Sequence, residues 1–131
     1  MTYLNLEYNR FVGTLPKELS HMPLLSDFNL QYNQVAGPLP SELGLLTHMT
    51  RLNLRGNDLS GTLPEELSEM QQSLFELYLE ENPLLTGIVP EALCYLNGTC
   101  TDGNIKTCDE PVMLVITCSN TTSLCGCDCP C

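Results

Sequence analysis

A motif of about 24 residues recurs four times in residues 1–93 and constrains the fold more than any other feature of the chain. Its clearest copy runs from Leu52 to Leu67 and has the form L-x-L-x-x-N-x-L-x-G-x-L-P-x-x-L. Its asparagine, glycine and proline return in step at Asn9, Asn33, Asn57 and Asn82, at Gly13, Gly37, Gly61 and Gly87, and at Pro16, Pro40, Pro64 and Pro90. A fixed period of this length predicts a chain built from stacked copies of one unit.

Each residue type of the motif has a physical role in a turn of a coil. Two apolar residues two positions apart share one face of a short strand and point inward. The asparagine carries donors and acceptors, so at the bend it can pair backbone groups that a turning chain leaves without partners. The glycine permits a backbone angle that other residues resist, and the proline suits the first turn of a short helix. The inward strand residues are Leu4 and Leu6, Phe28 and Leu30, Leu52 and Leu54, and Leu77 and Leu79, and the leucines that close each coil are Leu19, Leu43, Leu67 and Leu93.

One such coil cannot bury its own apolar face, so successive coils stack and place their strands side by side. The sequence therefore predicts an α/β solenoid with coils at residues 1–24, 25–49, 50–74 and 75–93. The variant G-x-[IL]-P resembles the plant-type leucine-rich repeat of receptor ectodomains and polygalacturonase-inhibiting proteins. This resemblance, which covers residues 1–93, implies a right-handed coil with a parallel sheet on the concave face and short 3-10 or α turns on the convex face.

The charge balance limits the classes of partner. The chain has 16 Asp and Glu against 5 Lys and Arg, a net charge of −11. This disfavours nucleic acid and anionic membrane surfaces, which attract basic proteins. The longest apolar run, residues 112–116, is too short to span a bilayer, and no signal peptide is visible. Because Met1 falls on the first position of a repeat, we expect further repeats and any targeting segment upstream. A dimer formed through the open end is the alternative.

All eight cysteines lie in residues 94–131, which we predict to be a separate C-terminal segment. An even number of clustered cysteines predicts disulfides, with 105 possible connectivities among Cys94, Cys100, Cys108, Cys118, Cys125, Cys127, Cys129 and Cys131. Sequons at Asn97 and Asn120 also favour the secretory route. The alternative is a metal-binding tail in a reducing compartment. The segment resembles the cysteine caps of secreted leucine-rich-repeat proteins, and we expect its residues 112–117 to add a last strand to the sheet, with Leu114 and Ile116 facing inward.

Catalytic and cofactor motifs are missing from the sequence. Neither histidine, His21 nor His48, has a serine or cysteine in a nucleophile pattern nearby, and both fall in linkers near the convex side. There is no P-loop, dinucleotide-binding glycine motif, H-E-x-x-H motif or EF-hand loop. The cluster of Glu65, Glu66 and Glu69 is typical of a solvated helical face. We therefore predict a protein that is not an enzyme and needs no cofactor or metal.

The outward residues of the strands form columns across the concave face, which solenoids use to bind partners. We predict an extracellular or cell-surface recognition module for a protein, peptide or carbohydrate. The predicted contact residues are Tyr3, Tyr8, Asp27, Gln31, Tyr32, Arg51, Arg55, Glu76, Tyr78 and Glu80. The two arginines are the strongest candidates, although the nearby acids can instead simply neutralise them. The rival interpretation is a structural capping fragment of a longer repeat protein. In the same columns, Gly56 is predicted to accept serine with little effect.

Overall fold

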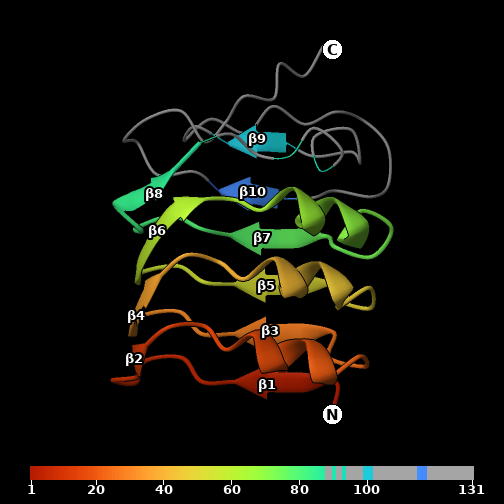
Figure 1. The fold of residues 1–131 in the computed structure, drawn as a ribbon, viewed down its shortest axis with the longest axis horizontal. Helices are drawn as coiled ribbons and strands as arrows, with labels where there is room; N and C mark the ends of the chain where they lie inside the picture. Colours follow the sequence, from red (N-terminus) through yellow and green to blue (C-terminus); the bar gives the residue numbers. More distant parts are fainter. Residues whose placement is uncertain (88–89, 91–92, 94–98, 102–114, 118–131) are drawn as a thin grey trace.

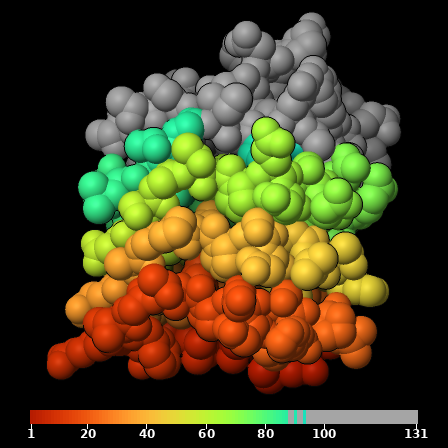
Figure 2. Space-filling model, in the orientation of Figure 1, coloured from red at the N-terminus to blue at the C-terminus, as the bar shows by residue number. Residues whose placement is uncertain are grey.

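The computed structural model describes residues 1–87, 90, 93, 99–101 and 115–117, and in them each repeat forms one turn of a solenoid. Figure 1 shows the turns stacked on one another, with the N-terminal turn at the bottom. Each turn runs from a strand through a bend into a second short strand and then into a 3-10 helix. In Figure 2 the turns form successive bands of side chains that lie against each other. The predicted solenoid is confirmed.

Parallel strands form the sheet on the concave wall, here called the concave sheet. Its spatial order is β1 (Tyr3–Asn5), β3 (Asp27–Asn29), β5 (Arg51–Asn53), β7 (Glu76–Tyr78), β10 (Val115–Thr117) and β9 (Thr99–Thr101). The middle residues of the first four strands are in register and point inward: Leu4, Phe28, Leu52 and Leu77. Equivalent residues on either side of them therefore form straight rows across the outer face of the sheet.

A second parallel sheet, which the sequence analysis did not predict, follows the bend of each coil. Its strands are β2 (Val12–Gly13), β4 (Gln34–Gly37), β6 (Asp58–Thr62) and β8 (Leu84–Thr86), in that order. They run up one side of the stack in Figure 1. The motif glycines of these coils have φ between +78° and +94°, as the sequence predicted for this position.

Short 3-10 helices form the convex wall at η1 (Lys17–His21), η2 (Ser41–Leu45) and η3 (Glu65–Met70). The motif prolines stand one residue earlier than predicted, as extended residues that precede the helix. Each proline carbonyl accepts the N–H of the leucine three residues later, for example Pro40 from Leu43 at 3.1 Å. A 3-10 turn needs only this carbonyl, so the missing proline N–H costs nothing. The bond turns the leucine inward, and Leu43 is 2% exposed.

Leucines dominate the core, and an asparagine ladder runs through it. Asn33, Asn57 and Asn82 are buried. Nδ2 of Asn57 donates to the carbonyl of Leu54 in its own coil and to that of Leu30 in the preceding coil, both at 3.1 Å. Its Oδ1 accepts the N–H of Val35 at 3.1 Å. Asn33 and Asn82 repeat these contacts one coil away on either side. The predicted ladder is confirmed for these three residues.

The first coil differs from the others because it packs against a neighbouring coil on only one side. Asn9 is exposed, and its Nδ2 donates to the carbonyls of Leu6 and Glu7 in its own coil. Leu4 and Leu6 are only partly buried. Leu15, by contrast, is 5% exposed and belongs to the core.

The C-terminal segment contributes two described strands to the concave sheet. The strand predicted at residues 112–117 is described from Val115 to Thr117 as β10, which pairs with β7. It is not the last strand of the sheet, because β9 pairs with its other side. Leu114, the sequon residues Asn97 and Asn120, and every cysteine except Cys100 lie outside the described residues. The division between residues 93 and 94 stays a prediction. No helix in the described part of the chain is long and apolar enough to cross a membrane.

Candidate ligand-binding face

The outward side chains of the concave sheet make two polar networks, one on the first coils and one on the later coils. The first centres on the carboxylate of Glu7. Its Oε2 accepts from Nδ2 of Asn29 at 2.8 Å and from Nε2 of Gln31, and its Oε1 accepts from Nδ2 of Asn5 at 3.0 Å. Oε1 of Gln31 in turn accepts from Nδ2 of Asn53 at 3.1 Å. A chain of amides therefore joins three successive coils.

Arg51 forms the second network together with its neighbours on β7. Its Nε lies 2.9 Å from Oε2 of Glu76, although the N–H does not point at that oxygen, so the contact is an ion pair without a hydrogen bond. Its guanidinium carbon lies 5.7 Å from the centre of the Tyr78 ring. Asp27, which is in register with Arg51 on the other side, has a buried Oδ1 that accepts no hydrogen bond from any described residue.

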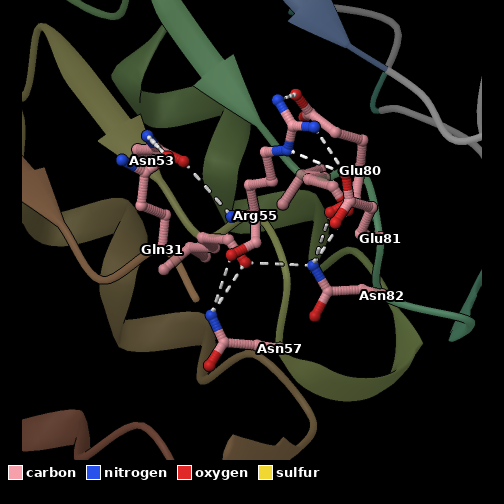
Figure 3. A network of polar contacts seen from close by, with 9 residues as sticks. Gln31, Asn53, Arg55, Asn57, Glu80, Glu81 and Asn82 are labelled. Carbon is pink, nitrogen blue, oxygen red and sulfur yellow. Dashed lines mark hydrogen bonds and ion pairs between the residues drawn. The ribbon is translucent and has the colours of Figure 1, made fainter. Parts of the chain in front are cut away.

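Arg55 is held from both sides. Its guanidinium contacts Glu81 through Nε and Nη2 and lies 3.5 Å from Oε1 of Glu80 through Nη1, as Figure 3 shows. On the opposite side its guanidinium carbon lies 5.4 Å from the centre of the Tyr32 ring. Tyr32 also stacks on Tyr8, with ring centres 4.9 Å apart and an interplanar angle of 26°. One continuous stack thus runs over four coils: Tyr8, Tyr32, Arg55 and Glu81.

The residue before each ladder asparagine adopts a left-handed conformation. Tyr8, Tyr32 and Glu81 have φ of 53°, 54° and 59°, and Gly56 has φ of 65°. A Cβ built on Gly56 would lie 2.5 Å from Cδ1 of Tyr32, because the ring leans over this position. The prediction that Gly56 accepts serine is therefore wrong. The residue has an outward position, but its backbone angle and the ring both require glycine.

These contacts shift several pKa values. Hydrogen bonds from Asn5 and Gln31 lower the pKa of Glu7, so its carboxylate is charged at neutral pH. The hydrogen bond to Glu81 raises the pKa of Arg55. Partial burial raises the pKa of Tyr32 and Tyr78, which keeps both phenols neutral. At neutral pH, Glu7 and Arg55 therefore stay charged and the rings of Tyr32 and Tyr78 stay neutral.

The structure brings the predicted contact residues together on one wall, and it joins others to them. Glu7, Asn29, Asn53 and Glu81 were outside the predicted set, yet they hold Gln31 and Arg55 in place. Their outward position in the strand motif was a signal that could have identified them. Tyr3 contributes an exposed ring beside Asp27, and no ring contact joins it to the other described tyrosines.

The histidines and the cysteine-rich tail were the candidates for catalysis and metal binding. His21 and His48 are exposed on the convex side, as predicted. No group of three or more histidine, cysteine, aspartate or glutamate side chains in the described ranges could hold a metal ion. The tail cysteines of the alternative metal site lie outside those ranges.

Comparison with known families identifies the repeat. The family model described as Leucine Rich Repeat matches residues 1–22, 48–70 and 73–96, together more than half of the chain. The chain belongs to the leucine-rich-repeat family. The model does not match residues 23–47, although this second leucine-rich repeat has the same strand, bend and 3-10 helix. Phe28 and Val35 stand there in place of motif leucines.

Solved plant structures share the leucine-rich-repeat fold. The ectodomain of the membrane receptor kinase GASSHO1/SCHENGEN3 from Arabidopsis thaliana, in complex with CASPARIAN STRIP INTEGRITY FACTOR 2, is 30% identical over 91% of this chain and 16% of its own, with a TM-score of 0.73. A plant ice-binding protein is 31% identical over 73% of this chain and 31% of its own, with a TM-score of 0.67.

The BIR3–SERK2 complex from Arabidopsis thaliana is 24% identical over 95% of this chain and 59% of its own, with a TM-score of 0.68, and shows the fold alone. The chain thus spans between about a sixth and three fifths of these three proteins. A search of curated proteins gave no match.

Proposed function

We propose that this chain is a non-catalytic recognition module that binds a protein or peptide along its concave sheet, in an extracellular or cell-surface setting. The observation that carries the proposal is the stack of Tyr8, Tyr32, Arg55 and Glu81 across four coils. Tyrosine and arginine are enriched among the residues that dominate binding energy. Here ring stacking and ion pairs hold them in fixed positions before any ligand arrives, which lowers the entropy lost on binding.

The family comparison supports the same proposal. The GASSHO1/SCHENGEN3 ectodomain was solved in complex with a named factor, and it shares 30% of its residues with this chain over the aligned region. The concave sheet is open to such a partner in the described residues, since Tyr3 and Tyr8 are 55% and 69% exposed. A carbohydrate ligand is a further possibility that the exposed rings allow, but no contact in the structure favours it over a peptide.

A structural role in capping a longer repeat array is the second candidate. The observation that favours it is the continuation of the sheet beyond the fourth coil, where β10 pairs with β7 and β9 pairs with β10. Disulfides among the cysteines of residues 94–131 and glycosylation at Asn97 and Asn120 belong to this proposal as well as to the first. A cap of this kind needs no ligand on the concave sheet, so a binding experiment separates the two.

The test is selection from an unbiased library of 12-residue peptides displayed on phage, with the full chain immobilised. Selected peptides are then measured against Tyr3→Ser with Tyr8→Asn, which removes two exposed rings of the concave face. The matched control is Leu24→Ser with Leu45→Ser, which removes two apolar side chains of similar exposure, 58% and 64%, outside this sheet. We expect at least a tenfold loss of affinity in the tyrosine variant and none in the control. Selected peptides that lose affinity equally in both, or no selected peptide at all, would favour the capping role.

A further inference from the structure

One row of outward side chains in the interior of the concave sheet carries two carboxylates and a single cation. Asp27, Arg51 and Glu76 stand in register on β3, β5 and β7, which lie side by side in the stack (Figure 1). The strands on either side add no charge to this row, because β1 places Tyr3 beside Asp27 and β10 places Val115 beside Glu76. The described row therefore has one carboxylate more than its cation can neutralise.

Arg51 is shared unequally between the two carboxylates. Its Nε lies 2.9 Å from Oε2 of Glu76, and its guanidinium carbon lies 5.7 Å from the centre of the Tyr78 ring. On the other side, Oδ1 of Asp27 is buried without a hydrogen-bond donor, and Nε of Arg51 is buried without a hydrogen-bond acceptor. Among the described residues these two neighbours in one row hold the buried side-chain atoms that lack a hydrogen bond. Both atoms carry a cost that a different arrangement of Arg51 would remove.

Arg51 can exchange one carboxylate for the other. Asp27 and Glu76 each lie one strand away from it, on opposite sides of β5, and neighbouring strands are about 4.8 Å apart. The side chains of Arg51 and Glu76 are 43% and 39% exposed, so neither is confined by the core. Pairing with Asp27 would leave Glu76 and the Tyr78 ring without their cation. The exchange is therefore unfavourable unless a second cation takes the place that Arg51 leaves.

The place that Arg51 would leave already has the groups that hold a cation. The carboxylate of Glu76 supplies the opposite charge, and the ring of Tyr78 supplies a face over which an ammonium or guanidinium group is attracted. An acidic ligand group is less suited to the row. It would have to displace Glu76 from Arg51, and it would then face the carboxylates of Asp27 and Glu76 together.

We propose that the partner of the concave face places a lysine or arginine side chain against Glu76 and Tyr78, and that Arg51 moves to Asp27 as this cation enters. The row has one ion pair in the free chain and two in the complex, and Oδ1 of Asp27 gains a donor. This inference rests on the proposed recognition function and names the chemistry of the ligand and one of its contacts. Arg51 is then a side chain that the ligand displaces, so its removal should strengthen binding.

The probe is a pair of fluorescent 12-residue peptides of glycine and serine, one with three lysines and one with three acetyl-lysines. Acetylation removes the charge of a lysine and keeps its length. Binding to the full chain is measured by fluorescence anisotropy at low and moderate salt. We expect the lysine peptide to bind at least tenfold more tightly than the acetylated peptide. Equal affinities for the two peptides would overturn the inference.

Two variants that each remove one positive charge separate the site from the general attraction of a chain with a net charge of −11. Arg51→Gln removes the charge from the row, and Lys17→Gln removes it from the convex helix η1. We expect Arg51→Gln to bind the lysine peptide at least threefold more tightly than the parent, because Glu76 and Tyr78 are then free, and Lys17→Gln to bind like the parent. Equal gains in the two variants, or weaker binding by Arg51→Gln, would contradict displacement.

A double-mutant cycle tests whether Arg51 moves to Asp27. Asp27→Asn should weaken the lysine peptide at least threefold in the parent, because Arg51 loses the carboxylate to which it moves. In the Arg51→Gln background nothing has to move, so the same replacement should change affinity less than twofold. Equal losses in both backgrounds would place the ligand cation at Asp27 itself and reject the exchange. Glu76→Gln should weaken binding in both backgrounds, and unchanged affinity there would also reject it.

Nuclear magnetic resonance follows the movement of Arg51 directly. The chain has three arginines, Arg10, Arg51 and Arg55, and each gives one Nε–H signal. Saturation with the lysine peptide should shift the Arg51 signal, because its Nε–H gains an acceptor, and should leave the Arg10 signal in place. The shift should be lost in Asp27→Asn. An unmoved Arg51 signal at saturation would overturn the inference, and unchanged melting temperatures establish that each variant is folded.

The library selection described above distinguishes failure of this inference from failure of the proposed function. Selected peptides that depend on Tyr3 and Tyr8 but bind Glu76→Gln as they bind the parent would retain the recognition function and reject the exchange. Selected peptides that contain lysine or arginine and lose affinity for Glu76→Gln would support both. If no selected peptide depends on the tyrosines and the lysine peptide does not depend on Glu76, both proposals fail.

Discussion

At the residue before each ladder asparagine, backbone strain is either offset by side-chain contacts or avoided by a glycine. A left-handed backbone costs an ordinary L-residue about 1–2 kcal/mol. Tyr8, Tyr32 and Glu81 adopt it nonetheless, and each makes a ring stack or an ion pair there. Gly56 avoids the strain and makes no side-chain contact of its own, but it leaves the space into which the Tyr32 ring leans. The aromatic stack therefore depends on a glycine one coil away.

Replacing Gly56 with alanine tests this dependence. We expect the free energy of unfolding, measured by urea denaturation, to fall by about 2 kcal/mol or more, from backbone strain plus the clash with Tyr32. In a Tyr32→Ala background the clash is gone, so the same replacement should cost only about 1 kcal/mol. An equal cost in both backgrounds would show that the ring does not confine this position.

At the scale of the element, the asparagine ladder joins the backbones of neighbouring coils at the bend. Asn33, Asn57 and Asn82 each donate to the carbonyl of the residue just after the strand of their own coil and to the equivalent carbonyl of the preceding coil. The oxygen of each asparagine holds the N–H at the start of the preceding coil's second strand or just before it, as Asn33 does for Phe11 and Asn57 for Val35. The ladder thus fixes the spacing of both sheets at the bend.

Asn57→Ala and Asn9→Ala are a matched pair of replacements at the same position of the repeat. Asn57 is 4% exposed, and its loss leaves the N–H of Val35 without its side-chain acceptor, while the carbonyls of Leu30 and Leu54 keep one asparagine donor each, from Asn33 and Asn82. At about 1–3 kcal/mol for a buried group left unpaired, we expect the free energy of unfolding to fall by about 1–3 kcal/mol. Asn9 is exposed, so water can replace its bonds and the loss should stay below about 0.5 kcal/mol. Similar melting temperatures for the two variants would contradict a supporting role for the ladder.

The periodic residues allowed most of the fold to be predicted, because every coil requires the same residue type at the same position. Comparison of the four copies along the chain was enough to predict that the leucines point inward, that the asparagine lies at the bend and that the glycine has a positive φ. The partners of the outward residues could not, since they depend on neighbours in other coils. Arg55 pairs with both Glu80 and Glu81, and Gln31 bonds to Glu7 and Asn53. The second sheet was missed because its short strands have no alternation of their own.

In the part of the chain that the structure describes, each coil packs on its neighbours in the stack, so we expect the stability to be close to a sum over adjacent pairs. The first coil of the 131-residue chain has one described neighbour, and the third has one on each side. The difference is visible in burial: Leu52 and Leu54 are 1% and 0% exposed, while the equivalent Leu4 and Leu6 are only partly buried. Stability should therefore rise from the first coil toward the middle of the stack.

Hydrogen exchange can measure this gradient, because the backbone bonds at the two places are the same. The N–H groups of Leu6 and Tyr8 donate to the second coil at 2.8 and 3.0 Å, and those of Leu54 and Gly56 donate to the fourth at 2.9 and 3.0 Å. If bond geometry alone set protection, the two pairs would exchange at equal rates. We expect Leu6 and Tyr8 to exchange at least about tenfold faster, since opening the first coil disrupts one interface and opening the third disrupts two.

The exchange experiment is run at two protein concentrations, so that self-association through the first coil would appear as protection that rises with concentration. Faster exchange of Leu6 and Tyr8 at both concentrations would establish a gradient that belongs to the single chain. Equal protection of both pairs in the dilute sample would contradict the additive description, because burial of Leu4 and Leu6 on one side alone would then suffice to hold a coil closed.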